Sequence, residues 1–345
     1  MNAQSGVGPF NSWETVRYEL LNMRICDLGL KIEGSRLQPM IRRLYRELST
    51  RRLGFRPEAY LTDSWGCPDE VPIIGIPFYL ADARLTRIEQ EQTGEAEDSE
   101  TVMMFLRHEA GHAFNYAYRL WEDPEWRKVF GPFSKPYRDA FVPQPHTRDF
   151  VRHLFTLHHG HAYAQKHPDE DFAETFAVWL TPGSAWRRRY RNWSVIHKLI
   201  YVDRLMRRIG RREPLCAGGK RLNPLESIAI TLAQHYGQRV ERYRSTAQGY
   251  IDDRLREIFP KLPGPGGRPM LPILRQYHPE LLTRLTRWSG LEESEVNTIL
   301  AKLEQRTAAL RIKCDPNRYD EALLDIGALA TVLAMEFAYT GRVLD

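Results

Sequence analysis

The 345-residue chain has little cysteine, no marked excess of one charge and no long apolar run. Its four cysteines, Cys26, Cys67, Cys216 and Cys314, are scattered, and no two have the spacing of a metal-binding or redox pair. This pattern argues against a disulfide framework and predicts reduced thiols in the cytoplasm. The net charge of +5 is small for a dedicated nucleic-acid-binding protein, so we do not expect nucleic acid as a partner.

The N-terminal residues lack the basic and apolar regions of a signal peptide, and we expect residues 1–12 to form a disordered lead. The most apolar segment, Ala322 to Ala334, contains Asp325 and is too short to cross a bilayer. It predicts a buried core helix instead. The composition, 42% hydrophobic and 27% charged residues, is that of a globular protein, which we expect to be cytoplasmic and without membrane contact.

The sequence that indicates chemistry is His108-Glu109-Ala110-Gly111-His112. Four residues apart on a helix, the two imidazoles leave the same face and can bind one metal ion. Glu109 lies beside that face, where it can hold a water molecule as a general base. His-Glu-x-x-His is the signature of zinc peptidases. Because so short a pattern also occurs by chance, it needs a surrounding helix and a third ligand downstream.

The residues around this motif favour a long helix that runs from about Ser99 to Leu120, with Ser99 or Asp98 as its N-cap. Apolar residues recur at helical spacing on both sides of the histidine row. Gly111 in the middle of a helix costs about 1 kcal/mol relative to alanine. We therefore expect another backbone to approach the helix closely at Gly111.

A second helix is predicted from Pro168 to Leu180, because proline and acidic residues favour a first helical turn. Glu170 and Glu174 share one face of this helix. Catalytic zinc takes three protein ligands and an open fourth position. We choose Glu170 as the third ligand and Glu174 as the carboxylate that holds a histidine through its far ring nitrogen. The sequence leaves open whether Glu170 or Glu174 is the zinc ligand. If neither acid binds metal, the segment would be a surface helix with solvated acids.

Six of the 11 histidines lie between His146 and His167. One interpretation is a second metal site in this region. None of the six is paired with a carboxylate that is not already assigned, so we favour the interpretation that they line the same cleft or a helix surface.

Together, the zinc motif, Ala162-Tyr163-Ala164 and the run from His167 to Thr175 resemble the bacterial putative zinc-binding metallopeptidases (peptidase Mx), a gluzincin-type zincin family. The resemblance extends over roughly residues 15–205. The chain is more distantly similar to the lethal-factor and Pro-Pro-endopeptidase group. There the first Glu of a Glu-x-x-x-Glu helix binds zinc, and a catalytic tyrosine lies seven residues earlier. This similarity implies the same roles for Glu170 and Tyr163. Asp169 departs from the nearer family, where Trp is expected.

The resemblance implies a zinc-dependent endopeptidase that hydrolyses peptide bonds with a zinc-activated water. Glu109 would be the general base, and Zn²⁺ would be held by the two motif histidines and Glu170. Tyr163 would donate a hydrogen bond to the oxyanion, with His159 or His161 as the alternative donor. Tyr163 could equally be a half-buried packing residue. Two other functions stay open, a zinc hydrolase of a non-peptide amide and a non-catalytic binding protein, although the latter would not need Glu109.

We predict an α+β, mostly helical fold, with a zincin-like metallopeptidase domain over residues 13–210 and an all-α C-terminal module over residues 211–345. Segments 55–62 and 71–80 favour strands, and the prolines in the second confine it to a sheet edge. An extended peptide substrate could pair with that edge by β-augmentation. Residues 89–100 favour a loop and residues 121–144 an irregular segment.

The stretch 187–212 is rich in arginine and aromatic residues. Such a stretch could bind nucleic acid, but we favour a solvated face of helices. Beyond it, Asn223-Pro224 predicts the start of a helix that ends near Phe259. Three further helices are expected near 270–288, 291–311 and 317–340. The C-terminal helices carry no evident chemistry, and we expect them to dock on the catalytic domain or to recruit a protein partner.

Overall fold

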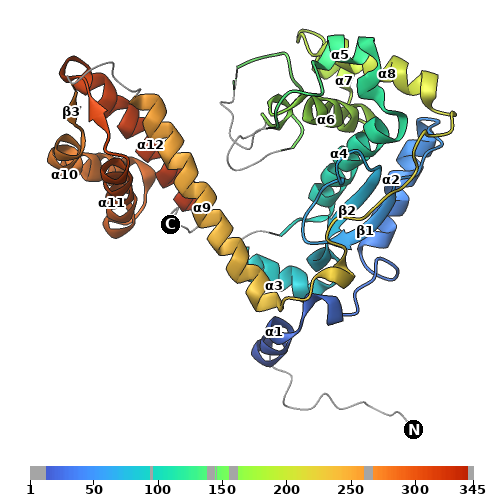
Figure 1. The fold of residues 1–345 in the computed structure, drawn as a ribbon, viewed down its shortest axis with the longest axis horizontal. Coiled ribbons are helices and arrows are strands. Elements are labelled where there is room, and N and C mark those ends of the chain that lie inside the picture. Colours follow the sequence, from blue (N-terminus) through green and yellow to red (C-terminus); the bar gives the residue numbers. More distant parts are fainter. Residues whose placement is uncertain are drawn as a thin grey trace. The chain divides into compact units, whose positions relative to one another are not determined.

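The computed structural model describes residues 13–93, 96–137, 144, 146–154, 162–259 and 267–340. The predicted disordered lead, residues 1–12, lies outside this part of the chain. The regular structure is mostly helical (Figure 1), as predicted. The chain forms two compact units, Met1–Ala233 and Gln234–Asp345. Within the described residues, no helix has both the length and the apolar character needed to span a membrane.

The first unit is built from helices and one parallel pair of strands. Its strands are β1 (Glu58–Thr62) and β2 (Ile73–Pro77), with Tyr60 opposite Gly75. Its α-helices are α1 (Trp13–Asn22), α2 (Leu37–Thr50), α3 (Ala83–Thr93), α4 (Ser99–Tyr118), α5 (Pro124–Phe130), α6 (Pro168–Leu180), α7 (Trp186–Arg189) and α8 (Ile196–Ile209).

Helix α4, which carries the zinc motif, is the centre of the first unit and packs against α2, α6 and β2 (Figure 1). It begins as predicted, because the Asp98 carboxylate accepts the Thr101 amide at 2.7 Å. Its side chains from Leu106 to Ala117 are all buried. A helix that is enclosed on every side holds its polar side chains in fixed positions, and this is what a metal site requires.

The close approach expected at Gly111 is confirmed. A Cβ atom at Gly111 would lie 2.7 Å from the Cα atom of Ala173 in α6. No side chain fits there, so glycine is the residue that lets α4 and α6 come into backbone contact. Every residue of α6 is buried, and the interpretation of α6 as a surface helix with solvated acids is therefore wrong.

The outer edge of β2 is not open along its length. Gly75 donates to the Gly66 carbonyl at 2.8 Å and accepts from the Gly66 amide at 3.4 Å. Pro77, at the end of the strand, has no amide hydrogen to offer. A peptide therefore cannot pair with β2 at Gly75 while Gly66 is bonded there, contrary to the expectation of a free edge. Segment 63–72, which contains Gly66, covers this side of the strand instead.

Two segments predicted to be irregular contain helices. Residues 89–93 belong to α3, whose buried face includes Leu85 and Ile88. Segment 89–100 was predicted to be a loop because it is acidic, and its helical pattern was therefore not recognised. Helix α5 lies in the segment 121–144, where the Asp123 carboxylate accepts the Glu125 amide at 2.8 Å and Pro124 occupies the first turn. The N-cap aspartate and the proline after it were thus the sequence features from which α5 could have been predicted.

Residues 211–233 pack on the first unit, and the boundary between the units therefore lies later than the boundary predicted after Gly210. The amides of Leu215 and Cys216 both donate to the Ala117 carbonyl at the end of α4. Further along, the amides of Ile25 and Cys26 donate to the carbonyls of Ile230 and Ile228. This pairing holds residues 228–231 out of a helix, so the helix predicted from Asn223 begins only at Leu232.

The second unit surrounds its own apolar core, to which α10, α11 and α12 contribute. These are the three helices expected near 270–288, 291–311 and 317–340. The buried residues of α11 are Val296, Ile299, Leu300, Leu303 and Thr307. The unit is not purely helical, because two short strands pair antiparallel. Its elements are α9 (Leu232–Ile258), β3 (Arg268–Pro269), α10 (Leu271–Ser289), α11 (Glu293–Ala309), β4 (Lys313–Cys314) and α12 (Tyr319–Thr340).

Candidate metal centre

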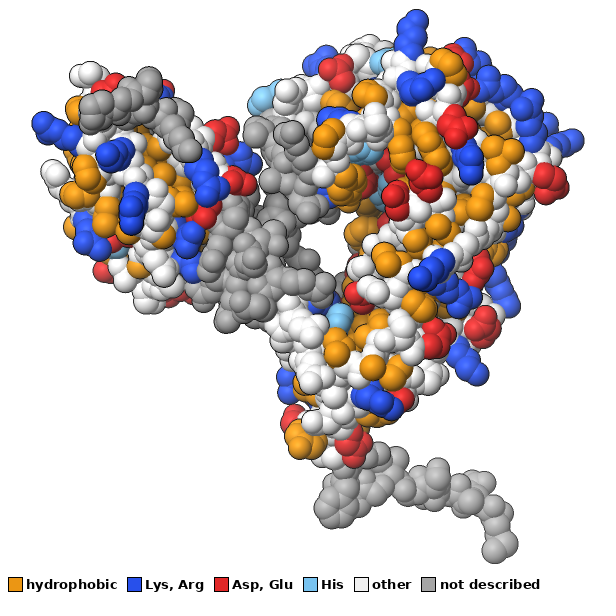
Figure 2. All heavy atoms as spheres, in the orientation of Figure 1, with side chains coloured by type: hydrophobic (Ala, Val, Ile, Leu, Met, Phe, Trp, Pro, Cys, Tyr) orange, Lys and Arg blue, Asp and Glu red, His pale blue; other side chains and the backbone are white. Residues whose placement is uncertain are grey.

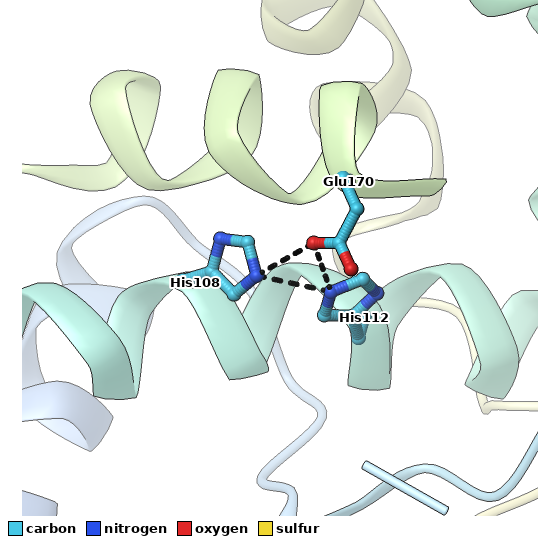
Figure 3. Close-up of side chains that lie close together, drawn as sticks. All are labelled: His108, His112 and Glu170. Atoms are coloured by element: carbon cyan, nitrogen blue, oxygen red, sulfur yellow. Dashed lines mark hydrogen bonds and ion pairs between the residues drawn. The ribbon is translucent and has the colours of Figure 1, made fainter. Parts of the chain in front are cut away.

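The structure brings His108, His112 and Glu170 together between α4 and α6 (Figure 3). The Nε2 atoms of the two histidines lie 3.1 Å apart. Oε2 of Glu170 lies 3.1 Å from Nε2 of His108 and 3.3 Å from Nε2 of His112. All three side chains are buried, and among the described residues they are the one cluster of three or more histidine, cysteine or acidic side chains arranged to hold a metal ion.

The spacing of these three atoms suits zinc. Donors about 2.0–2.1 Å from a tetrahedral zinc ion lie about 3.3–3.4 Å from one another. The separations of 3.1, 3.1 and 3.3 Å are close to that value. Two imidazoles and one carboxylate also leave a fourth position open, as catalytic zinc sites do. The donor set and its geometry therefore fit the metal that the sequence predicts.

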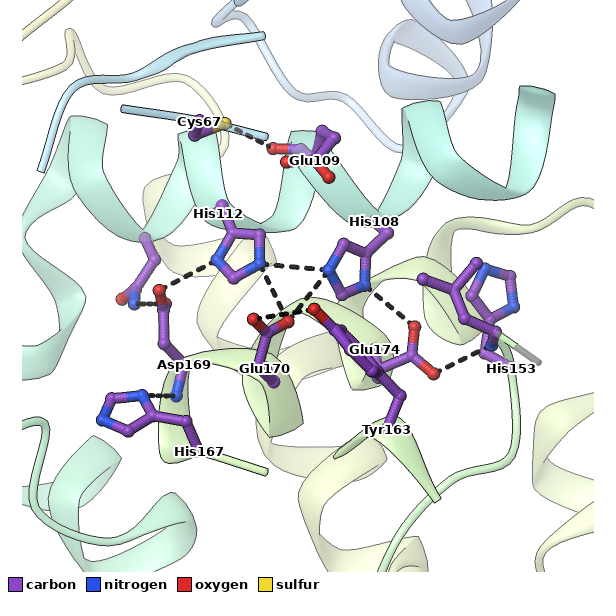
Figure 4. Close-up of polar contacts among 12 residues, drawn as sticks. Cys67, His108, Glu109, His112, His153, Tyr163, His167, Asp169, Glu170 and Glu174 are labelled. Carbon is purple, nitrogen blue, oxygen red and sulfur yellow. Dashed lines mark hydrogen bonds and ion pairs between the residues drawn. The ribbon is translucent and has the colours of Figure 1, made fainter. Parts of the chain in front are cut away.

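Carboxylates of α6 hold both histidines from behind (Figure 4). Nδ1 of His108 lies 2.8 Å from Glu174, and Nδ1 of His112 lies 2.9 Å from Asp169. A carboxylate at Nδ1 orients the ring and leaves Nε2 as the metal donor. Glu174 is itself fixed by the Leu154 amide at 2.9 Å. Glu174 thus takes the place predicted for it, and Glu170 is the acid that faces both Nε2 atoms.

Asp169 is a site residue that the sequence did not assign. Besides His112, its carboxylate accepts hydrogen bonds from Asn115 at 2.6 Å and from Tyr116 at 2.7 Å. Its amide donates to Nδ1 of His167, the N-cap of α6, at 3.1 Å. The one feature of the sequence that pointed to position 169 is that aspartate stands there, where tryptophan is expected in the family that the chain resembles. A charged side chain this buried and this well bonded holds His112 in one orientation.

Replacing Asp169 by asparagine is expected to weaken zinc binding by about 10- to 100-fold, because the amide removes the negative charge behind His112. Competition with a chromophoric chelator measures this affinity. Asp27→Asn is a suitable control, because Asp27 is exposed and the partners of its carboxylate among the described residues are its neighbours Arg24 and Cys26. Equal zinc affinity of the Asp169→Asn and wild-type proteins would contradict the role of this carboxylate.

Glu109 is buried beside the metal donors, and its Oε2 atom has no hydrogen-bond partner among the described residues. Burial, which disfavours the charged form, is the main reason why the pKa of Glu109 is raised above 4.5. For His108, burial by itself lowers the pKa. The hydrogen bonds to Glu170 and Glu174 outweigh this effect and raise the pKa from 6.5 to about 9. The thiol of Cys67 donates to the Glu109 carbonyl at 3.3 Å.

Two tyrosine hydroxyls meet the second carboxylate oxygen of Glu170. Tyr137 donates to Oε1 at 2.6 Å and Tyr163 donates to the same atom at 3.3 Å. Tyr163 therefore lies at the site, as the resemblance implied. Tyr137 was not assigned a role from the sequence. Both tyrosines line a cavity of about 470 Å³ that also contains the three metal donors and Glu109.

The remaining histidines of the 146–167 region do not form a second metal site within the described residues. His167 caps α6, and its Nε2 donates to the Lys135 carbonyl at 2.8 Å. His153 lies near Met104, and burial lowers its pKa below 6.5. His158, His159 and His161, two of which were proposed as alternative oxyanion donors, lie outside the described residues.

Acidic residues neutralise much of the basic stretch 187–212. Arg187 pairs with Asp203 at 2.8 Å, Arg208 pairs with Asp123 at 2.9 Å, and Arg204 pairs with Glu125. Figure 2 shows basic and acidic side chains interspersed on the face that it draws. These pairs favour a solvated helix face, as preferred from the sequence, over a nucleic-acid surface.

Comparison with known proteins finds one family model that matches the part of the chain containing the site. Residues 74–185 match the family model described as "Putative zinc-binding metallo-peptidase". The matched stretch is shorter than the 15–205 predicted, but it contains the three donors, Glu109 and the carboxylates behind the histidines. The resemblance to this zinc-binding family is thereby confirmed. The similarity to the lethal-factor group stays a prediction. No curated protein and no solved structure matches the chain.

Proposed function

We propose that the protein is a zinc-dependent endopeptidase. The observation that carries this proposal is one cavity lined by three metal donors at zinc spacing and by a buried carboxylate oxygen, Glu109 Oε2, for which the described residues offer no partner. A protein that only binds zinc needs the donors but has no use for a buried carboxylate oxygen that has no partner among the described residues, because burying such an atom is costly. Catalysis gives Glu109 a purpose, and the matched family is one of peptidases.

Bound zinc supplies Lewis-acid activation of a carbonyl group and of water. The protein supplies the proton transfers and the alignment. Glu109 takes a proton from the attacking water and later gives it to the leaving amine. Tyr163 donates a hydrogen bond to the oxygen on which negative charge develops. Asp169 and Glu174 keep the two histidine rings oriented while charge at the centre changes.

The substrate in this proposal is an extended peptide that lies beside segment 63–72. Trp65, Gly66, Cys67 and Asp69 of this segment line the cavity. The Trp65 ring is fixed by stacking on Phe105 of α4, with 5.2 Å between ring centroids. Because Gly66 already occupies β2 at Gly75, β-augmentation would add the peptide to this segment and not to β2.

The test measures metal content and peptide cleavage on the same preparation of the full chain. We expect about one zinc ion per chain and cleavage of an unbiased peptide library at internal bonds. Removal of the metal with a chelator is expected to abolish cleavage, and one equivalent of zinc is expected to restore it.

The outcomes separate the competing functions. Zinc binding without cleavage of any peptide, but with hydrolysis of small amides, would favour a non-peptide amide hydrolase. Zinc binding with no hydrolysis of either substrate class would support a binding protein on this scaffold. Absence of zinc binding by wild-type protein would exclude all three functions.

A further inference from the structure

The two oxygens of the Glu170 carboxylate face different partners. Oε2 faces the Nε2 atoms of both histidines, at 3.1 and 3.3 Å (Figure 3). Oε1 faces the tyrosines, with Tyr137 at 2.6 Å and Tyr163 at 3.3 Å. The carboxylate is largely buried, so little bulk water competes for either oxygen. The pattern predicts that only one of the two oxygens is available to a metal ion.

The two hydroxyls do not contribute equally. A hydrogen bond of 2.5–2.7 Å from a hydroxyl to a carboxylate is short and charge-assisted, whereas one at 3.3 Å is weak. Tyr137 is therefore the main partner of Oε1, although the sequence drew attention to Tyr163. An oxygen that accepts so short a bond has one lone pair committed to the hydroxyl and is turned toward it, and this disfavours its approach to a metal ion at ligand distance.

The ring of Tyr137 is held in place although 54% of the residue is exposed. The Lys166 ammonium group lies 4.2 Å from the ring centroid, a cation–π contact, and the His167 ring centroid lies 5.4 Å away. His167 is itself fixed as the N-cap of α6, three residues before Glu170. The hydroxyl is thus directed at Oε1 by contacts that do not depend on the hydroxyl itself.

We propose that Tyr137 is a positioning residue that restricts Glu170 to a single coordinating oxygen. The restriction keeps one position of the metal ion open for water and substrate, which a two-oxygen carboxylate would fill. It also explains two tyrosines at one carboxylate. Tyr137 orients the ligand, and the Tyr163 hydroxyl, at 3.3 Å from the same oxygen, keeps the role of hydrogen-bond donor to the substrate that is proposed above. The proposal rests on the metal site of the proposed function but not on its peptidase activity.

The test compares metal coordination in wild-type protein and in Tyr137→Phe, a change that keeps the ring and its contacts. Co²⁺ replaces zinc, and its visible absorption reports the coordination number. We expect the band of Tyr137→Phe to lose intensity and shift, as it does when four-coordinate Co²⁺ gains a ligand. X-ray absorption of the zinc forms should show one additional oxygen neighbour in this variant.

Two further variants control for the loss of a tyrosine hydroxyl. Tyr163→Phe is expected to change the Co²⁺ spectrum less than Tyr137→Phe does, because the Tyr163 bond to Oε1 is the longer of the two. Tyr118→Phe is expected to keep the wild-type spectrum, because the Tyr118 hydroxyl donates to the Arg212 carbonyl and not to the site. Thermal melting of each variant shows whether the fold is kept.

An unchanged Co²⁺ spectrum in Tyr137→Phe would overturn the inference and leave the zinc site intact. Failure of this variant to bind Co²⁺ at all would also overturn it, because the hydroxyl would then create the site and not adjust it. Failure of the wild-type protein to bind either metal is a different result, and it would remove the proposed function itself.

Discussion

Replacing Glu109 by glutamine is expected to lower the rate of peptide hydrolysis by about 10²- to 10⁴-fold, the contribution of a positioned general base. Glutamine has nearly the same shape but cannot accept the proton. Zinc content is expected to stay at the wild-type level, because His108, His112 and Glu170 are unchanged and Glu109 is not among the donors. Single-turnover kinetics together with metal analysis measures both quantities on one sample.

The matched control is Glu100→Gln, the same chemical change on the same helix. Glu100 lies in the first turn of α4, is 72% exposed and pairs with Arg43 on the surface. The Glu100→Gln protein should hydrolyse peptides at the wild-type rate. A Glu109→Gln protein that binds zinc and retains full activity would show that another group is the base.

Replacing Arg107 by leucine is expected to lower the free energy of unfolding by about 3–5 kcal/mol, the cost of breaking a buried ion pair. The Arg107 guanidinium donates to both oxygens of Glu47 in α2, at 2.7 and 2.8 Å. Both side chains are buried, at 3% and 7% exposure. Of the ion-pair partners of Glu47 in the described part of the chain, leucine would leave the half-exposed Arg43, at 3.2 Å. Denaturant unfolding of metal-free protein measures the effect without a contribution from zinc binding.

The double variant Glu47→Leu/Arg107→Leu separates loss of the pair from loss of packing. Removing both charges leaves no buried ion without a partner, so most of the stability should return. If Arg107→Leu alone costs less than about 1 kcal/mol, a value typical of surface pairs, the ion pair does not anchor α4 to α2.

Elements with a complete local signal were predicted correctly. The cap at Asp98 and the spacing of the histidines lie within one helix, so their meaning does not depend on distant contacts. The same holds for α6, where proline, acids and apolar spacing coincide. Where the local sequence pattern was ambiguous, tertiary contacts determined the secondary structure. Residues 228–231 could have been helical, but the carbonyls of Ile228 and Ile230 accept the amides of residues 26 and 25, which are about two hundred residues away in sequence.

At the candidate site, the spacing of residues along the chain predicts two imidazoles on one face of a helix and two acids on another helix. It does not predict that these two helices lie close enough for the side chains to meet. The contact of α4 with α6 at Gly111 and Ala173 sets the distance at which Glu170 meets both histidines. It also gives Asp169 its role, because only the packed helices bring that carboxylate to His112. Tyr137 reaches Glu170 from outside both helices, and no spacing rule relates them.

The sequence alone therefore determined the donor types, the helix that carries the histidines and the family resemblance, all of which follow from short-range pattern. The tertiary structure decided which acid faces the histidines, which carboxylates hold them and which tyrosine hydroxyl is bonded most closely to the acid. These choices depend on distances between helices, and such distances arise from the packing of side chains remote in sequence.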